Sequence, residues 1–181
     1  LACQFDRLLP IRGEVDHHAK ARQYLSRDCL VHRVVLDQQY AGIGAGGKGE
    51  SDLWMFYKSG KAEIACLCDV DDRQSVKSRK NYPKAKYYKD FREMLDKEGK
   101  SIDACSVSTP DHTHAVAAMA AMQLNKHVYV QKPLTHDIYE ARMLTEAAHR
   151  YKVVTQMGNQ GSSGDGVRML IDWYKAGLIG E

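Results

Sequence analysis

Short apolar runs alternate with amphipathic segments from residue 40 onwards. Apolar runs of about four to eight residues bounded by turn residues are typical of buried strands. We expect strands in the run that opens at residue 40 and at 62–69, 85–88, 102–109, 127–130 and 153–157. The segments between them have helical periodicity, which predicts helices at 50–60, 72–82, 90–99, 111–124, 138–151 and 165–177.

Two details refine this pattern. In the predicted helix 138–151, Ile138, Ala141, Leu144 and Ala148 fall on one stripe, which we expect to face the core. The first strand has a polar beginning, because Asp37, Gln38 and Gln39 stand where apolar residues belong. We therefore expect that strand to start at Tyr40 and the first edge of the fold to be weak.

The strand–helix alternation predicts an α/β fold with a parallel sheet covered by helices on both faces. Six strands in this order suit a doubly wound (Rossmann) sheet of order 3-2-1-4-5-6 with right-handed crossovers. Ligands of such sheets bind at the carboxyl ends of the strands. The residues that directly follow each strand are therefore the candidate site.

Composition narrows the class of protein. The chain of 181 residues is 44% hydrophobic and 27% charged, with a net charge of +3 and with acids and bases interspersed. This charge is too small and too scattered to indicate nucleic acid or a membrane surface as a partner. There is no apolar run of about 18 residues, and the first residues lack the apolar core of a signal peptide. We expect a cytoplasmic protein, with a periplasmic one as the alternative if a leader had been removed.

The cysteines do not form a recognisable metal or disulfide motif. There are five, Cys3, Cys29, Cys66, Cys68 and Cys105, with no C-x-x-C spacing. Cys66 and Cys68 lie two apart on a predicted strand, so both point to one face. We interpret them as small buried hydrophobic residues and expect no metal site.

A glycine-rich loop follows the first strand, with Gly44, Ala45, Gly46, Gly47 and Gly49 in the pattern G-x-G-x-x-G. Between a strand and a helix, this pattern is typical of dinucleotide binding. Gly44 allows a tight turn, Gly46 lets backbone N–H groups approach a pyrophosphate, and Gly49 lets the helix pack closely. The positive end of the helix dipole adds to the attraction for phosphate. The alternative is a glycine-rich turn without a ligand.

Asp69 follows the second strand, twenty residues after Gly49. A carboxylate at this place accepts hydrogen bonds from the adenosine ribose and repels a 2′-phosphate, so NAD is favoured over NADP. Arg73, four residues further on, is the one residue that favours NADP instead. Two alternatives remain open: Asp69 as a helix N-cap, and a methyltransferase that binds the ribose of S-adenosylmethionine.

Polar residues also follow the fourth, fifth and sixth strands, namely Thr109, Pro110, His114, Gln131, Lys132, Asn159 and Gln160. Pro110 steers Thr109 to an extended conformation, and Thr109 and His114 would lie beside the nicotinamide half of a dinucleotide. A single histidine in an alanine-rich helix is more often structural. A lysine at a strand end can equally be a surface residue.

Taken together, "GIGAGGKG", "CDVD", "STPDHTH", "KHVYVQKPL" and "QMGNQG" resemble the Gfo/Idh/MocA family of NAD(P)-dependent oxidoreductases, over about residues 40–181. These enzymes act mostly on sugars, inositols and related polyols. The resemblance implies that Lys132 reaches the substrate hydroxyl or carbonyl beside the nicotinamide as the catalytic residue. It implies that Pro133 holds the turn, often through a cis bond. One departure is Gln131, where the wider family has glutamate.

We therefore expect an NAD site formed by Gly44, Ala45, Gly46, Gly47, Gly49, Asp69, Thr109, Pro110, His114, Gln131, Lys132 and Asn159. The expected domains are an unassigned segment 1–36, a Rossmann domain 37–161, and residues 162–181 as the start of a truncated α/β substrate domain. The expected function is hydride transfer between nicotinamide and a sugar-like alcohol or ketone by a homo-oligomeric parent protein. The alternatives are an NAD-dependent glycosidase or lyase with transient redox, and a nucleotide-binding fragment without turnover.

Overall fold

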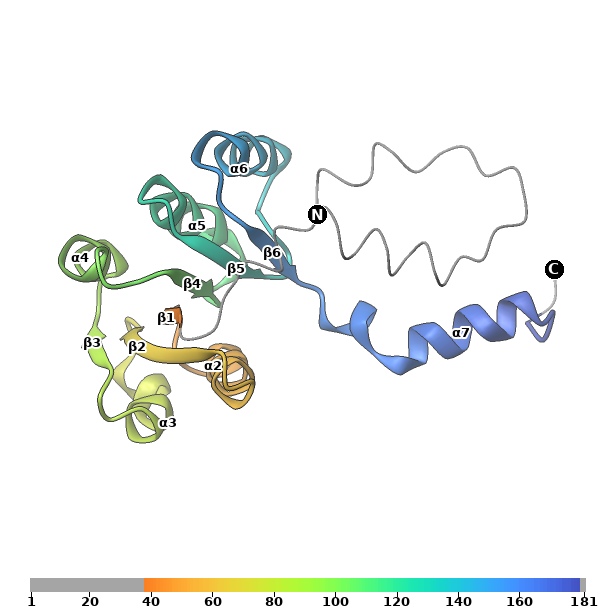
Figure 1. The fold of residues 1–181 in the computed structure, drawn as a ribbon, viewed down its shortest axis with the longest axis horizontal. Helices are drawn as coiled ribbons and strands as arrows, with labels where there is room; N and C mark the ends of the chain where they lie inside the picture. The colour runs from red at the N-terminus through yellow and green to blue at the C-terminus, as the bar shows by residue number, and fades with distance from the viewer. Residues whose placement is uncertain (1–37, 180–181) are drawn as a thin grey trace.

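The computed structural model describes residues 38–179, so the expectation for segment 1–36 lies outside the described residues. Its centre is a six-stranded parallel sheet of order β3-β2-β1-β4-β5-β6 (Figure 1). The strands are β1 (Gln38–Ile43), β2 (Ala62–Cys68), β3 (Lys86–Tyr88), β4 (Ala104–Val107), β5 (His127–Gln131) and β6 (Thr155–Gly158). The predicted fold class and strand order are confirmed.

Helices cover both faces of the sheet, with α2 and α3 on one face and α4, α5 and α6 on the other (Figure 1). The α-helices are α2 (Lys48–Lys58), α3 (Asp72–Asn81), α4 (Phe91–Glu98), α5 (His114–Gln123), α6 (Ile138–Tyr151) and α7 (Asp165–Lys175), with 3₁₀ turns η3 (Asp111–Thr113) and η4 (Gln160–Ser163). The first turn of the helix predicted at 111–124 is thus a 3₁₀ turn, and α2 begins two residues earlier than predicted.

The expected weak edge at the first strand is wrong. β1 begins at Gln38 and lies in the middle of the sheet, between β2 and β4. Its polar beginning is only partly satisfied. The Gln39 side chain donates to the Glu63 carboxylate at 3.1 Å, and the Gln39 N–H donates to Asp103 Oδ2 at 2.8 Å. The Gln38 Oε1 atom, in contrast, is buried without a hydrogen-bond partner.

The core has one cluster on each face of the sheet. The cluster under α4, α5 and α6 contains Cys66, Cys68 and Cys105. The cluster under α2 and α3 contains Ala45, Leu53, Ile64, Leu67 and Tyr82. Burial raises the pKa of Cys66 to about 11 and those of Cys68 and Cys105 to about 12. The three thiols stay protonated at neutral pH, which confirms their interpretation as buried hydrophobic residues.

Helix α6 only partly follows its predicted stripe, because Leu144 is buried whereas Ile138 is 73% exposed. Aspartates cap three helices: Asp71, Asp90 and Asp137 each accept a backbone N–H at the start of α3, α4 and α6. The N-cap of α3 is therefore Asp71, and Asp69 is free of that role. Gly60 follows the end of α2 with φ of 68°, as predicted for a C-terminal glycine.

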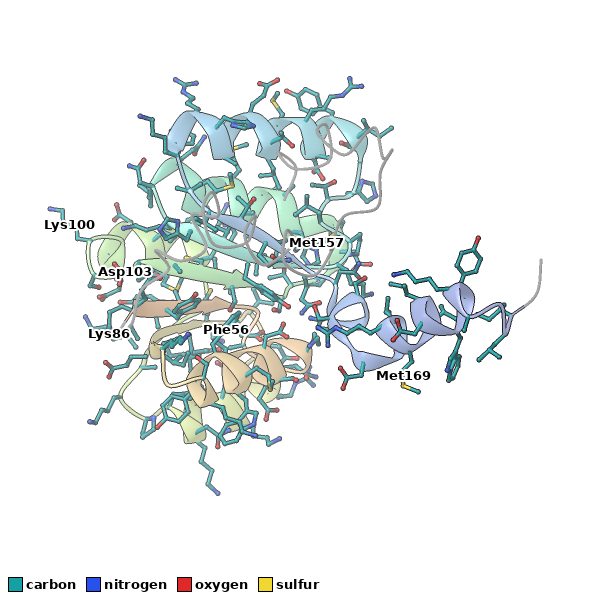
Figure 2. All side chains as sticks on the ribbon, turned by 45° about the vertical axis from the view of Figure 1, so that its right-hand side comes forward. Phe56, Lys86, Lys100, Asp103, Met157 and Met169 are labelled. Atoms are coloured by element: carbon teal, nitrogen blue, oxygen red, sulfur yellow. The ribbon has the colours of Figure 1, made fainter. Side chains whose placement is uncertain are left out.

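Helix α7 stands apart from the sheet (Figures 1 and 2), and none of its residues is buried. Its apolar side chains, among them Leu170 and Trp173, are about half exposed. The domain boundary at residue 161 stays a prediction. No helix among residues 38–179 is long and apolar enough to cross a membrane.

Candidate functional site

The loop between β1 and α2 requires glycine at several positions. Gly44 has φ of 82°, and a Cβ there would lie 2.6 Å from the Ser108 carbonyl oxygen. A Cβ at Gly46 would lie 2.6 Å from Gln74 Cβ and 2.7 Å from the Gln74 carbonyl oxygen in α3. Gly46 is thus needed for the packing of the loop against α3, a reason that the sequence pattern did not show.

Two backbone donors at the start of α2 are unpaired within the described residues. Among residues 38–179, the N–H groups of Gly47 and Lys48 have no hydrogen-bond partner. Such N–H groups at the N-terminus of a helix attract anions, assisted by the helix dipole. The geometry therefore fits a pyrophosphate at the predicted place.

Asp69 lies beside the loop at the end of β2. Its Oδ2 accepts the Gly46 N–H at 3.0 Å, and its Oδ1 accepts the Asp71 N–H at 3.0 Å. The carboxylate is thus fixed against the glycine loop, where one ribose of a dinucleotide would follow the phosphates. The structure brings the first two predicted parts of the site together.

Arg73 is bound to Asp71 and does not extend freely into the site. Its Nε lies 3.0 Å from Asp71 Oδ1, and its Nη2 lies 2.9 Å from Asp71 Oδ2. Hydrogen bonds from the Arg73 side chain and N–H lower the pKa of Asp71 to about 2. Hydrogen bonds from Lys89 and Tyr87 lower the pKa of Asp72 as well. Both carboxylates are therefore charged at neutral pH, and each is ion-paired, Asp71 with Arg73 and Asp72 with Lys89 and Arg79.

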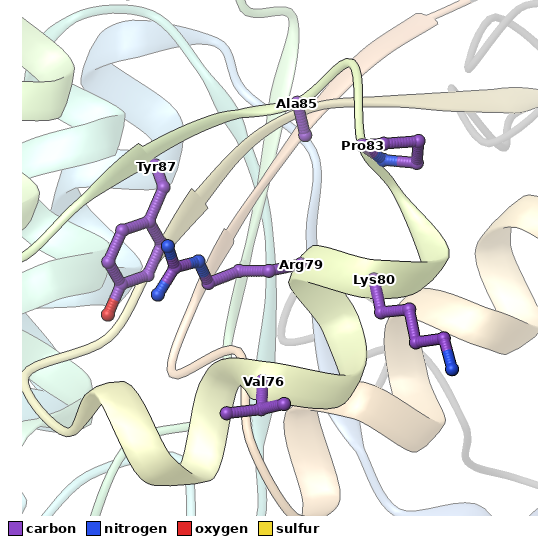
Figure 3. Close-up of a pocket in the computed structure, with 6 residues that line it drawn as sticks. All are labelled: Val76, Arg79, Lys80, Pro83, Ala85 and Tyr87. Atoms are coloured by element: carbon purple, nitrogen blue, oxygen red, sulfur yellow. The ribbon is translucent and has the colours of Figure 1, made fainter.

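A hollow lies behind this region, on the outer side of α3 and β3 (Figure 3). It is lined by Val76, Arg79, Lys80, Pro83, Ala85 and Tyr87. The Arg79 guanidinium packs over the Tyr87 ring at 4.4 Å from its centroid. The Tyr87 hydroxyl donates to the Asp69 carbonyl oxygen at 2.8 Å, which links the hollow to the candidate site.

His114 joins the ends of β4 and β5 from inside the protein. It is 1% exposed, its Nε2 lies 2.8 Å from the Thr109 carbonyl oxygen, and its Nδ1 lies 2.6 Å from the Pro133 carbonyl oxygen. Both ring nitrogens face acceptors, so a cofactor has no free nitrogen to contact. This geometry favours the structural alternative for His114, with an indirect role through the two loops that it connects.

Lys132 is exposed directly after β5, and the Lys132–Pro133 peptide bond is cis, as the resemblance implied. Gln131 is 4% exposed, and its side-chain amide points into the protein. Asn159 is exposed and donates to Ser162 Oγ at 2.9 Å. These residues follow neighbouring strands and therefore share one edge of the sheet.

Two residues of this region were missed by the sequence analysis, Asp52 and Ser108. Asp52 is 5% exposed and accepts hydrogen bonds from Lys48, Ser108 and Gln131. A single aspartate in a helix has no sequence signal of this kind, because two of its partners lie 56 and 79 residues away. Within residues 38–179 no group of three or more metal-binding side chains is found.

Comparison with protein families decides the assignment. The model of the Gfo/Idh/MocA oxidoreductase family, NAD-binding Rossmann fold, matches residues 39–159. The chain belongs to the Gfo/Idh/MocA family. The resemblance read from the glycine loop, Asp69 and the Gln-Lys-Pro segment is thereby confirmed.

Known relatives of this Gfo/Idh/MocA chain include proteins named as glycoside hydrolases. An α-N-acetylgalactosaminidase of Shewanella oneidensis is 29% identical over 148 residues, which cover 77% of this chain and 32% of the relative. A glycosyl hydrolase family 109 protein of Shewanella sp. strain ANA-3 is 28% identical with the same coverage. The chain thus spans about a third of the length of these curated relatives.

Solved structures share the fold at lower identity. Myo-inositol 2-dehydrogenase of Lactobacillus plantarum has a TM-score of 0.70 at 22% identity, covering 80% of this chain and 43% of that one. Scyllo-inositol dehydrogenase of Lactobacillus casei with bound NAD(H) and scyllo-inositol has a TM-score of 0.69 at 20% identity, with the same coverage. At these identities the likeness shows the fold.

Proposed function

We propose that this chain binds NAD across the carboxyl ends of the strands and serves hydride transfer to or from a sugar-like alcohol. The observation that carries the proposal is the fixed arrangement of the Gly44–Gly49 loop and Asp69, with the N–H groups of Gly47 and Lys48 left without a hydrogen-bond partner among the described residues. The loop would hold the pyrophosphate, and Asp69 would accept hydrogen bonds from the adenosine ribose. When bound, the nicotinamide ring supplies the hydride acceptor or donor.

The charges around Asp69 support NAD over NADP. Asp71 and Asp72 are ionised at neutral pH, and the Arg73 guanidinium is bound to Asp71. A 2′-phosphate would therefore be repelled by the Asp69 carboxylate beside the glycine loop, and the Arg73 guanidinium is already bound to Asp71.

Lys132 is the proposed catalytic residue. It is the exposed cation at the end of β5, one strand from the Thr109 loop. An ammonium group placed beside a substrate hydroxyl stabilises the alkoxide that develops as the hydride leaves, and in reverse it polarises the carbonyl. Thr109, Pro110 and Asn159 would border the same part of the crevice.

Calorimetric titration of the chain with NAD and with NADP tests the cofactor proposal. We expect NAD to bind more tightly than NADP. Asp69→Asn removes the charge and keeps one of the two acceptor oxygens, enough for the Gly46 N–H but not also for the Asp71 N–H, so it should weaken NAD binding and narrow the gap between the two cofactors. Asp96→Asn, on the exposed side of α4, is the control and should change neither affinity. Tighter binding of NADP, or no binding of either cofactor, would contradict the proposal.

A second candidate function is redox-assisted glycoside cleavage, in which a sugar is oxidised transiently, a substituent is eliminated and the hydride is returned. The observation in its favour is that the curated relatives named above are glycosyl hydrolase family 109 proteins and an α-N-acetylgalactosaminidase. The same cofactor site and the same lysine would serve this reaction.

Turnover by the full-length protein separates the two candidates. Simple polyols with NAD should give lasting NADH absorbance if the net reaction is oxidation. Glycosides should release free sugar without net NADH if the hydride is returned. In either case Lys132→Ala should leave NAD affinity nearly unchanged and lower turnover by about 100-fold or more, the size of effect that loss of one transition-state charge partner produces. Unchanged turnover would remove Lys132 from the mechanism.

A further inference from the structure

A buried carboxylate lies beneath the end of β5, outside the residues proposed to contact cofactor or substrate. Asp52 is 5% exposed on the second turn of α2. Its Oδ1 accepts from Lys48 Nζ at 2.6 Å, and its Oδ2 accepts from Ser108 Oγ at 2.9 Å and from Gln131 Nε2 at 2.6 Å. One side chain therefore connects α2, the residue after β4 and the last residue of β5.

The charge of this site depends on residue 131. An ionised carboxylate can only accept hydrogen bonds, whereas the Gln131 amide supplies a donor. A glutamate at residue 131 would place a second acceptor against Asp52 in a buried setting, where two adjacent carboxylates do not both ionise. Asp52 therefore suits the glutamine of this chain and disfavours the glutamate that is usual in the family.

The contact with Asp52 also fixes the other end of the Gln131 side chain. Gln131 Oε1 faces the Lys132 backbone N–H at 3.3 Å. Gly158 of β6 leaves room for this amide, since a Cβ there would lie 2.9 Å from Gln131 Nε2. The amide is therefore held between α2 and β6 while its carbonyl end meets the residue that carries the exposed ammonium group.

We propose that Asp52 is a positioning residue, which orients Gln131 and through it the Lys132 segment, and that it requires a neutral amide at residue 131. The importance of Asp52 for catalysis rests on the proposed function of Lys132. The contacts among Asp52, Gln131 and the Lys132 backbone do not depend on that function. The other charged and titratable groups that face Asp52 are Lys48 and Tyr129. Burial raises the pKa of Tyr129, and the negative charge of Asp52 raises it further.

A polarity swap tests the pairing. Gln131→Glu should unfold at about the wild-type temperature at pH 4.5, where the two carboxyl groups share a proton. As the pH rises to 7.5, it should lose about 4 °C or more in Tm relative to wild type, because the unfolded chain then releases the proton that the two adjacent carboxyl groups keep in the folded state. Asp52→Asn/Gln131→Glu restores one donor and one acceptor in reversed order, so it should recover most of that loss. The pairing would be overturned if the Tm difference between Gln131→Glu and wild type did not change with pH. It would also be overturned if the double variant were no more stable than Gln131→Glu at pH 7.5.

The backbone amide resonance of Lys132 tests the positioning role. It is identified in ¹⁵N-lysine-labelled protein by its disappearance in Lys132→Arg. Asp52→Asn and Gln131→Glu should each shift it by more than a line width, and the double variant should return it toward the wild-type position. Glu50→Gln is the matched control, because Glu50 lies on the same helix and pairs with Lys77, away from β5. It should not move the Lys132 resonance.

The outcomes separate this inference from the proposed function. Loss of stability in Asp52→Asn with an unmoved Lys132 resonance would reduce Asp52 to a structural residue and overturn the proposal. If Asp52→Asn does not fold, Gln131→Glu at pH 4.5 and 7.5 gives the same comparison. None of these measurements uses cofactor or substrate, so a failure of NAD binding would leave them unaffected.

Discussion

His114 holds two loops through its two ring nitrogens, which face the carbonyl oxygens of Thr109 and Pro133. His114→Ala would leave both carbonyls without this partner and open a small cavity. We expect the free energy of unfolding to fall by about 2–4 kcal/mol, as measured by urea denaturation. His112→Ala, on the exposed turn η3, is the control and should stay within about 0.5 kcal/mol of wild type. Equal losses in both variants would contradict the clamp role.

His127 makes the fold sensitive to mild acid. Its Nδ1 accepts the Val154 N–H at 3.0 Å, so the ring is neutral, and burial lowers its pKa. The folded pKa is below the unfolded value of about 6.5. This contribution to stability is therefore complete above that pH and is lost as the pH falls through the folded pKa.

His127→Asn offers the Val154 N–H an acceptor that does not titrate. We expect wild-type Tm to fall more steeply than that of His127→Asn between pH 7 and pH 5. His136→Asn, at an exposed position, should follow wild type. Parallel curves for all three proteins would show that His127 does not link pH to folding.

For single residues, sequence spacing predicted the glycines and Asp69 of the candidate site but not the residues that support them. Gly44, Gly49 and Asp69 stand in a local pattern that a reader of one sequence can see. Asp52 has no such pattern, because its burial depends on Ser108 and Gln131, which only the folded sheet brings near. Gly46 was assigned to phosphate approach alone, whereas its contact with Gln74 arises from the packing of α3.

At the scale of elements, the close approach of the glycine loop to α3 gives a testable asymmetry between adjacent glycines. A Cβ at Gly46 collides with Gln74, whereas a Cβ at Gly47 meets nothing within 4 Å. Gly46→Ala should displace α3 and cost about 1–3 kcal/mol of unfolding free energy. Gly47→Ala would place an L residue at φ of 52° and ψ of −113°, outside the left-handed helical region, so it should cost about 1–3 kcal/mol of local backbone strain without moving α3. The backbone amide resonances of α3 should therefore shift in Gly46→Ala and stay in place in Gly47→Ala, and unmoved α3 resonances in Gly46→Ala would contradict the packing role.

Element order was predictable, and element boundaries were less so. The apolar strands and their alternation with helices were sufficient for the sheet order. The start of β1 at Gln38 was missed because Gln39 is satisfied by Glu63 and Asp103, which come later in the chain. Ile138 was expected in the core, but it opens α6 and is exposed there. Periodicity predicts a face without showing which turns of the helix reach the neighbouring layer.

At the scale of the whole molecule, the sheet and α7 should be energetically separate. No residue of α7 is buried. Removal of residues 164–181 should therefore change the unfolding free energy of the remainder by less than about 0.5 kcal/mol. Trp54 on α2 remains as the fluorescent reporter, since Trp173 is removed with α7. A loss above about 1 kcal/mol would show that α7 supports the sheet.

Because β1 lies in the middle of the sheet, one of its two partner strands is synthesised much later than β1 itself. Ile43 pairs with Val107, its partner in β4, 64 residues further along the chain. At about 5–20 residues per second, translation needs roughly 3 to 13 s to bridge that gap. During this interval the nascent strand has β2 on one side and nothing native on the other. The carboxyl ends of β1 and β4 thus meet only after β4 has emerged, so the glycine loop that follows β1 reaches its final surroundings late in biosynthesis.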